Sequence, residues 1–420
     1  MIWGDSMTYI EFYETDAIEN LCGCLTNAPE RVILVGKNRK QMQKQADRYH
    51  AFFESRGKNV EFLCKSVNRN NLQFIVEVLS QIVKEYDDCV LDLTGGEDLY
   101  LVAAGIVSER YGGLQMHRFN IHSGAIVDCD QDGTTILKEA FPALTVEENI
   151  RIYGGDVVYS DVKADGTFRW DLSDEFKADV EAMWKVCKVD AKQWNKQIGV
   201  FAAAQKQRDT SQDPLTTVAL VSAVQEELNN NGGKYVTERR IYEELYQAGL
   251  LTAYYYDDAL LTVTYKNEQV KRCLTKAGTV LELKFYLMAQ KTRDEDGTLT
   301  YQSVMNGVYI DWDGEVQEGE DGTDTHNEID VMMMRGMVPV FVSCKNGRVD
   351  KNELYKLSTV ANRFGGKYAK KVLVTTALHL DPAADSIRQR AKEMDIQILE
   401  GIQNKPDEAL EKDIRTIWCS

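Results

Sequence analysis

Long apolar runs are missing from this sequence, and none approaches the roughly 20 residues that a membrane-spanning helix needs. The first residues, Met1 to Asp5, lack the basic and then apolar order of a signal peptide. Nine cysteines are scattered from Cys22 to Cys419 without a pair at zinc-binding spacing. We therefore expect a cytoplasmic protein whose thiols are reduced and mostly buried.

A surplus of basic residues is also missing, because 66 acidic residues outnumber 49 basic ones and give a formal net charge of −17. Such a chain repels nucleic-acid phosphates at long range, which argues against a surface built for nonspecific nucleic-acid binding. One segment is the exception. Between Lys345 and Lys371 eight basic residues stand against only Asp350 and Glu353, so we expect a local positive face there.

The N-terminal third alternates strands and helices. Strand-length apolar runs at residues 8–13, 31–36, 60–64 and 89–93 are separated by segments of helical pattern. This order is typical of a mostly parallel sheet covered by helices, and 420 residues are enough for two or three domains. We therefore predict an α/β fold that begins with a Rossmann-like domain over residues 1–150.

The informative point of this domain is Asp92-Leu93-Thr94-Gly95-Gly96, where a strand runs into a glycine turn before a helix. Two glycines there let backbone N–H groups converge on an anion, and the helix N-terminus favours negative charge. The segment is neither a Walker motif nor the three-glycine dinucleotide fingerprint, so a plain tight turn is the alternative. The carboxyl ends of parallel strands share one edge, where α/β domains bind ligands. The candidate binding residues at that edge are Thr15, Asp16, Lys37, Asn38, Arg39, Thr94, Gly95, Gly96, Glu97 and Asp98.

Residues 151–266 are interpreted as a connector. A mostly helical segment over residues 173–231 is followed by a helix after Thr237 and by a hairpin with strands at 250–256 and 260–265. Helix, helix and hairpin in that order suggest a small winged-helix-like module. Because acids crowd its candidate recognition helix, we expect a packing or hinge role and not DNA reading. These acids are Glu238, Glu243 and Glu244.

A predicted hairpin organises the C-terminal part, residues 267–420. Apolar strands at 331–334 and 338–344 flank a glycine turn, so their pairing brings Asp330 and Lys345 together at the open end. The carboxylate can hold a divalent cation, and the ammonium beside it can touch a phosphate. These two groups are the minimum for metal-assisted phosphodiester cleavage.

The elements around that hairpin follow the order helix, three strands, helix, strand. The first helix is expected over residues 267–291 and carries Glu282, while Asp330 lies on the second core strand and Lys345 on the third. In this order, residues 267–400 resemble the PD-(D/E)xK nuclease superfamily, whose core is restriction-endonuclease-like. With the Rossmann-like domain and its glycine turn, the whole chain resembles the CRISPR ancillary nucleases that join a cyclic-oligoadenylate-sensing (CARF) domain to such a nuclease.

The resemblance implies a homodimer whose paired CARF domains hold one cyclic oligoadenylate, the tetra-adenylate. This messenger would switch on metal-dependent cleavage of DNA or RNA. The resemblance also implies catalytic roles for Asp330, Lys345 and Glu282, with Mg²⁺ or Mn²⁺ held by Asp330, Glu282 and the carbonyl of Cys344.

The sequence departs from the family pattern at Ser343, which replaces the acid expected two residues before the lysine. A neutral hydroxyl contributes less to cation binding than a carboxylate, so a second acid must come from elsewhere. Glu282 is the first choice and Glu353 the second, whereas Glu328 is expected to point away from the site.

Two other functions stay open, beside an expected nuclease with little sequence specificity. In one, the chain senses a nucleotide and regulates transcription, with an inactive nuclease-like domain; dependence of cleavage on metal would separate the two. In the other, the N-terminal domain is an ordinary nucleotide enzyme. Against it, no catalytic His or Cys lies near the glycines, since His50, His117 and His122 are expected to be structural.

Overall fold

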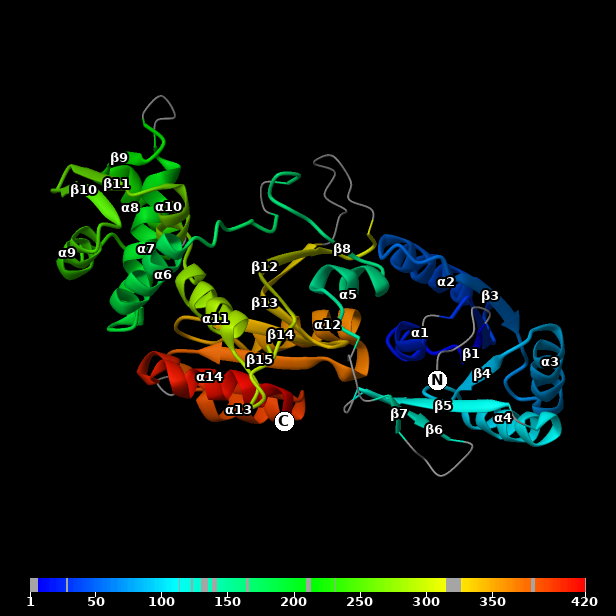
Figure 1. Ribbon diagram of the computed structural model, residues 1–420. Helices are drawn as coiled ribbons and strands as arrows, with labels where there is room; N and C mark the ends of the chain where they lie inside the picture. Colours follow the sequence, from blue (N-terminus) through cyan, green and yellow to red (C-terminus); the bar gives the residue numbers. More distant parts are fainter. Residues whose placement is uncertain are drawn as a thin grey trace.

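The structure is a computed structural model of the chain, shown in Figure 1. It describes residues 7–27, 29–112, 114–121, 124–129, 135–137, 142–163, 166–208, 213–230, 232–314, 326–378 and 382–419. Within these residues the strands form sheets of seven, three and six strands. Figure 1 places the domain of the six-stranded sheet between the N-terminal domain, in blue, and the connector, in green.

The N-terminal sheet has the strand order β3-β2-β1-β4-β5-β6-β7. The first five strands in that order are parallel, and β6 and β7 add antiparallel strands at one edge. The strands are β1 (Thr8–Phe12), β2 (Arg31–Gly36), β3 (Glu61–Ser66), β4 (Cys89–Asp92), β5 (Gln115–Asn120), β6 (Ala125–Asp128) and β7 (Thr135–Leu137). The helices are α1 (Cys22–Asn27), α2 (Arg39–Ser55), α3 (Leu72–Glu85) and α4 (Asp98–Tyr111).

Alternation along β1 explains why helices cover both faces of this sheet. Tyr9 packs in one core with residues of α1 and α2, whereas Ile10 and Phe12 pack in another core with residues of α3 and α4. The predicted Rossmann-like sheet is therefore confirmed. Its first helix is shorter than expected, because the Asn20 amide instead donates to the carbonyls of Glu14 and Asp16 and holds a turn.

The connector packs its helices on a three-stranded sheet of order β10-β11-β9. The expected hairpin is present as β10 (Leu251–Tyr256) and β11 (Leu260–Tyr265). A further strand, β9 (Thr216–Leu220), pairs with β11 inside the segment that was expected to be mostly helical. The helices are α6 (Asp174–Cys187), α7 (Ala191–Lys206), α8 (Val221–Asn230) and α9 (Arg239–Gln247). From α7 onward the order is helix, strand, helix, helix and hairpin, a winged-helix-like arrangement.

The C-terminal sheet has the order β16-β15-β14-β13-β12-β8. The predicted hairpin is present as the antiparallel pair β13 and β14, and β14, β15 and β16 run parallel. The short strand β8 lies at the start of the range that the sequence analysis assigned to the connector, yet it pairs with β12 of this sheet. The strands are β8 (Asp156–Val157), β12 (Ser303–Asp311), β13 (His326–Arg335), β14 (Val338–Lys345), β15 (Lys370–Thr375) and β16 (Ile396–Glu400).

Helices cover both faces of this sheet as well. Residues of α11 (Thr279–Lys291) pack in one core with Val331, and residues of α12 (Lys351–Gly365) pack in the other with Met332. The expectation of one long helix over residues 267–291 is wrong, because Gly278, with a φ of +91°, separates α10 from α11. The other elements are α10 (Glu268–Thr275), α13 (Ala384–Glu393), α14 (Asp407–Thr416) and the 3-10 helices η1 (Gly366–Tyr368), η3 (Ile402–Asn404) and η4 (Ile417–Cys419).

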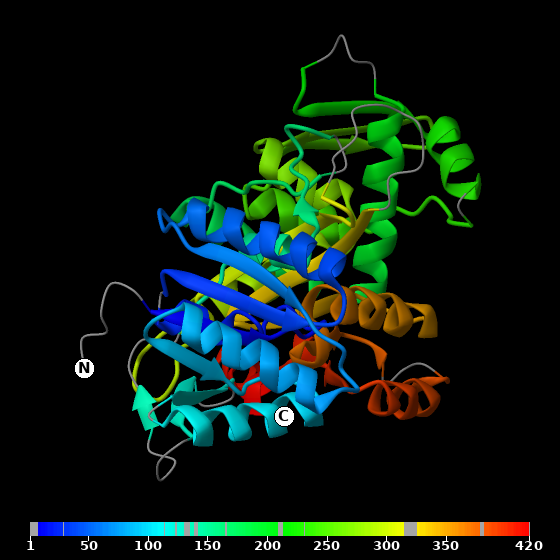
Figure 2. The ribbon, with the colours of Figure 1, turned by 90° about the vertical axis from the view of Figure 1, so that its right-hand side faces the viewer.

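The N-terminal and C-terminal domains touch through α5 (Val146–Ile152) and the end of α12. The Asn149 amide donates to the carbonyl of Phe364 over 2.6 Å, and Arg363 donates to the carbonyl of Tyr153 over 2.6 Å. Figure 2 views the molecule from the side of the N-terminal domain, whose strands lie in front. In the described part of the chain, no helix is both long enough and apolar enough to span a membrane.

Candidate functional site

The hairpin of β13 and β14 brings Asp330 and Lys345 together, as its pairing predicts. Val331 pairs with Val342, which places Asp330 opposite the end of β14. One carboxylate oxygen of Asp330 accepts from the backbone N–H of Cys344 over 2.6 Å and lies 3.8 Å from the Lys345 ammonium. The catalytic roles of these two residues stay predictions, but their side chains share one site.

Asp330 lies at a bend in the sheet. Ile329 and Val331 would share a face in a regular strand, yet they pack in different cores. On β12, the position opposite Asp330 is Gly307, which has a φ of +58°. The amide of Asn306 donates to the Asp330 carbonyl over 3.0 Å and ties the two strands together at this point. The bend places the Asp330 carboxyl at the rim of both cores.

Lys345 is held by an acid from the next helix. Glu353, in the first turn of α12, lies 3.0 Å from the Lys345 ammonium and 3.3 Å from that of Lys356. Burial lowers the pKa of Lys345, but the charges of Asp330 and Glu353 outweigh burial and raise it above its ordinary value. The ammonium therefore stays charged, which suits it to neutralise a phosphate and not to act as a base. Glu353 is its counter-ion in this structure.

Glu282 is the second buried acid near the site. It lies in the first turn of α11, with one carboxylate oxygen close over Gly278, where an added Cβ would meet that oxygen at 2.8 Å. Burial, and then the charge of Asp330, raise the pKa of Glu282 to about 8. Burial also raises the pKa of Asp330. Two neighbouring carboxylates repel each other when both are ionised, and a bound cation would offset that repulsion.

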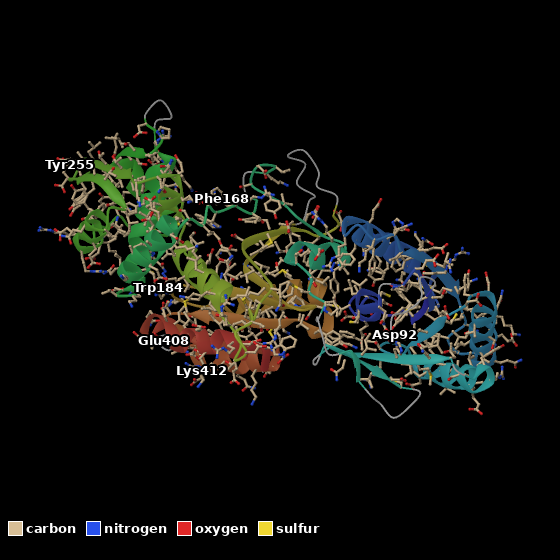
Figure 3. The ribbon with its side chains drawn as sticks, viewed as in Figure 1. Asp92, Phe168, Trp184, Tyr255, Glu408 and Lys412 are labelled. Atoms are coloured by element: carbon tan, nitrogen blue, oxygen red, sulfur yellow. The ribbon has the colours of Figure 1, made fainter. Side chains whose placement is uncertain are left out.

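The expectation that Glu328 points away from the site is wrong. Glu328 and Asp330 line the same small pocket, of about 60 Å³, together with Ser343, Lys345 and Glu353. Glu328 pairs with Lys276 over 2.7 Å and accepts from the Tyr309 hydroxyl over 2.9 Å. It also lines a second pocket, which contains Glu282 and the aromatic rings of Phe168 and Trp170. Figure 3 labels Phe168, on the segment that precedes α6.

The donors present fit a hard divalent cation such as Mg²⁺, which takes one or two protein carboxylates and completes its shell with water. In the ranges that the structure describes, no group of three or more His, Cys, Asp or Glu side chains is arranged to hold a metal ion. A site here would therefore rest on the carboxylates of Asp330 and Glu282 and on the Cys344 carbonyl. Ser343 donates its hydroxyl to Asp330 over 3.3 Å, which orients that carboxylate.

The predicted positive face is narrower than expected. Arg363, Lys367 and Lys371 are held by groups of the protein itself, respectively by backbone carbonyls, by Glu19 and by the Met394 carbonyl. The basic side chains that stay exposed next to the hairpin are Arg348, Lys351 and Lys356. A backbone-binding surface at this site therefore depends on these three.

The glycine turn lies between β4 and α4, as predicted. The side chain of Asp92, the last residue of β4, holds it in place. The Asp92 carboxylate accepts from the Thr94 N–H over 2.7 Å, and burial raises the pKa of Asp92 to about 6. Figure 3 labels Asp92 within the N-terminal sheet. Thr94 accepts from the Phe119 N–H over 2.8 Å, which fixes the turn to β5. Gly96 has a φ of +110°, a conformation that favours glycine.

An anionic partner of this turn was missed by sequence reasoning. Glu14 accepts the Gly96 N–H over 2.8 Å, so a carboxylate occupies the donor that we assigned to a phosphate. Glu14 lies two residues after the end of β1, at the same sheet edge as the predicted residues. Its place at that edge is the signal that could have found it.

The other predicted binding residues are divided between several tasks. Asp16 faces the C-terminal domain, where it accepts from the Tyr153 hydroxyl over 2.6 Å and from the Lys367 N–H over 2.9 Å. Asn38 caps α2, and Glu97 pairs with Arg69 over 3.0 Å. Five predicted residues keep exposed side chains at this edge, namely Thr15, Lys37, Arg39, Glu97 and Asp98.

One of the described histidines, His117, pairs with Asp92 in the sheet register of β4 and β5. The buried His117 lies 3.2 Å from the Tyr9 hydroxyl, and His50 is exposed on α2. His122 lies outside the described residues.

Two solved structures share this fold along nearly their whole lengths. Protein VC1899 from Vibrio cholerae aligns with a TM-score of 0.70 and 15% identity, over 98% of this chain and 98% of that chain. Can2 from Sulfobacillus thermosulfidooxidans, solved in complex with cyclic tetra-adenylate, aligns with a TM-score of 0.67 and 16% identity, over 97% of this chain and 99% of that chain. No protein-family model matches the sequence, and a search of curated proteins finds no match. The chain therefore has the full-length α/β architecture of these two proteins, and the predicted fold class is confirmed.

Proposed function

We propose that this protein is an endonuclease of type III CRISPR antiviral defence that requires Mg²⁺ or Mn²⁺ and that a cyclic oligoadenylate, the tetra-adenylate, activates. The observation that carries the proposal is the Asp330 and Lys345 pair at the open end of the hairpin, with Glu282 as a second buried acid. Support for the activator comes from the likeness in fold to Can2, whose structure holds cyclic tetra-adenylate.

The proposed mechanism assigns each residue a task. Asp330, Glu282 and the Cys344 carbonyl would hold the cation, which when bound polarises the scissile phosphate and lowers the pKa of a water. The Lys345 ammonium, kept charged by its acidic neighbours, neutralises charge that develops on the phosphate. Glu353 keeps that ammonium in place between substrates.

The proposed substrate is DNA or RNA, bound with little sequence specificity. Arg348, Lys351 and Lys356 are exposed beside the hairpin and would contact phosphates. Phosphate contacts position a nucleic acid but carry no base information. The formal net charge of −17 repels phosphates at long range, so these local basic side chains have to offset that repulsion at the site.

A homodimer is part of the proposal, with one activator held across its two-fold axis. α4 begins next to the glycine turn and leaves Leu101 and Val102 exposed, at 40% and 49% of their surface. An added Cβ on Gly105 would meet nothing within 4 Å. Because a glycine carries no side chain, an apolar helix face that contains one can pack closely against the same helix of a second protomer. Such a contact would bring two glycine turns together.

The alternative, a nucleotide-sensing regulator with an inactive nuclease-like domain, is favoured by one observation. Ser343 stands where the superfamily has an acid, and it is used to orient Asp330. Mn²⁺ binding separates the two functions. We expect calorimetric titration to show Mn²⁺ binding to the protein and at least a roughly tenfold loss of affinity in Asp330→Asn, with Asp313→Asn as the control. A protein that binds no Mn²⁺ and cuts nothing would be the regulator.

A further inference from the structure

The Glu14 carboxylate lies where a ligand phosphate is expected. It accepts the Gly96 N–H over 2.8 Å, and its side chain passes over Gly95, where an added Cβ would meet Glu14 Cγ at 2.6 Å. Glycine at position 95 therefore makes room for the acid, whereas at Gly96, whose φ is +110°, an added Cβ would meet the Phe12 ring at 3.0 Å. A carboxylate on a backbone N–H at a helix start makes the same kind of contact as a phosphate oxygen.

A phosphate and this carboxylate exclude each other. Gly96 has one N–H, and a second anion brought to it would meet the negative charge of Glu14 at hydrogen-bond range. A phosphate that binds the turn must therefore displace Glu14. The backbone of Glu14 is tied to the residues that follow it. The Glu14 N–H donates to the Asn20 side chain, which donates in turn to the carbonyls of Glu14 and Asp16.

Two further residues of this tied segment, Asp16 and Glu19, contact the C-terminal domain. Asp16 accepts the backbone N–H of Lys367 over 2.9 Å. Glu19 accepts the Tyr368 hydroxyl over 2.9 Å and pairs with the Lys367 ammonium over 2.6 Å. Lys367 and Tyr368 belong to η1, which directly follows α12.

α12 connects this junction to the hairpin site. The helix has 15 residues, so it spans about 22 Å. Its last turn leads into η1, and its first turn carries Glu353, which holds Lys345 over 3.0 Å. α12 and η1 therefore connect residues 16–19 at one end with the site lysine at the other.

We propose that Glu14 is an internal surrogate for the activator's phosphate, and that a phosphate switches the protein by displacing it. In the ligand-free state Glu14 closes the glycine turn, residues 14–20 hold η1, and α12 holds Lys345 through Glu353. Displacement of Glu14 moves the tied segment and, through η1, the helix. This inference rests on the proposed function, since it names how the proposed activator acts on that site.

Binding of cyclic tetra-adenylate to Glu14→Gln tests the displacement. The amide keeps a hydrogen-bond acceptor but removes the charge that competes with phosphate, so we expect roughly tenfold tighter binding than wild type by calorimetry. Glu54→Gln removes an equal charge from an exposed position on α2 and should bind like wild type. If Glu14→Gln binds cyclic tetra-adenylate no more tightly than Glu54→Gln does, Glu14 is not a surrogate for the phosphate.

Hydrogen exchange of the ligand-free protein keeps the test independent of the proposed function. We expect Glu14→Ala to speed exchange in peptides that cover residues 93–98 and 366–370, and Glu54→Ala to leave both unchanged. If no variant binds cyclic tetra-adenylate, the proposed activator is wrong, and exchange alone decides the surrogate. Unchanged exchange in both peptides of Glu14→Ala then overturns it.

Discussion

At the scale of single residues, the raised pKa of Glu282 makes the stability of the metal-free protein depend on pH. The folded protein binds this proton more tightly than the unfolded chain, because the pKa rises from 4.5 to about 8 on burial near Asp330. Stability therefore falls as the pH rises from about 4.5 towards 8. We expect the melting temperature of Glu282→Gln to fall less between pH 6 and pH 8.5 than that of the wild type. Scanning calorimetry without metal measures both.

The matched control for this experiment is Glu295→Gln, which changes an exposed acid in the same domain. It should follow the wild-type pH dependence. If Glu282→Gln loses as much melting temperature as the control over this range, Glu282 is already ionised at pH 6 and the account of two opposed buried carboxyls fails. Added Mn²⁺ should flatten the wild-type curve, because a cation replaces the proton.

At the scale of elements, the buried Lys284 joins three helices that carry or support the site. It lies on α11, two residues after Glu282, and pairs with Glu181 of α6 over 2.7 Å and with Asp407 of α14 over 2.9 Å. Lys284 is 1% exposed, whereas the two acids stay 40% and 51% exposed and can be hydrated when it is removed. We expect Lys284→Met to lower the free energy of unfolding by about 1–2 kcal/mol, discounted for that exposure.

Chemical denaturation measures this loss, with Lys412→Met as the control. Lys412 is an exposed lysine on α14, labelled in Figure 3, and its substitution should change the unfolding free energy by less than about 0.5 kcal/mol. Equal effects of the two substitutions would mean that Lys284 does not hold α6, α11 and α14 together.

Elements with strong local patterns were predictable from the sequence, and those that depend on tertiary contacts were not. The hairpin of β13 and β14 follows from two apolar runs around a glycine turn, so Asp330 and Lys345 could be paired in advance. The break between α10 and α11 depends on the left-handed backbone of Gly278, which a continuous helical pattern hides. The contact of Glu14 with Gly96 joins residues 82 apart and needs the folded sheet edge.

At the scale of the whole molecule, the proposed dimer depends on the exposed apolar face of α4. We expect Leu101→Asp to shift the protein from dimer to monomer in sedimentation velocity, because a charge buried in a self-packed helix face has no partner. Leu299→Asp is the matched control, since Leu299 is 39% exposed and Leu101 40%, and it should leave the mass unchanged. Identical masses for wild type and Leu101→Asp would place the dimer contact elsewhere or remove it.

The most direct test of the whole account is cleavage of a supercoiled plasmid and a labelled RNA with Mn²⁺, with and without cyclic tetra-adenylate. We expect cutting that needs both the metal and the messenger. The rate should fall by roughly 100-fold or more in Lys345→Ala and by only a few-fold in Lys356→Ala, whose lysine shares Glu353 but stays at the surface. Cutting that ignores the messenger, or that survives the loss of Lys345, would contradict it.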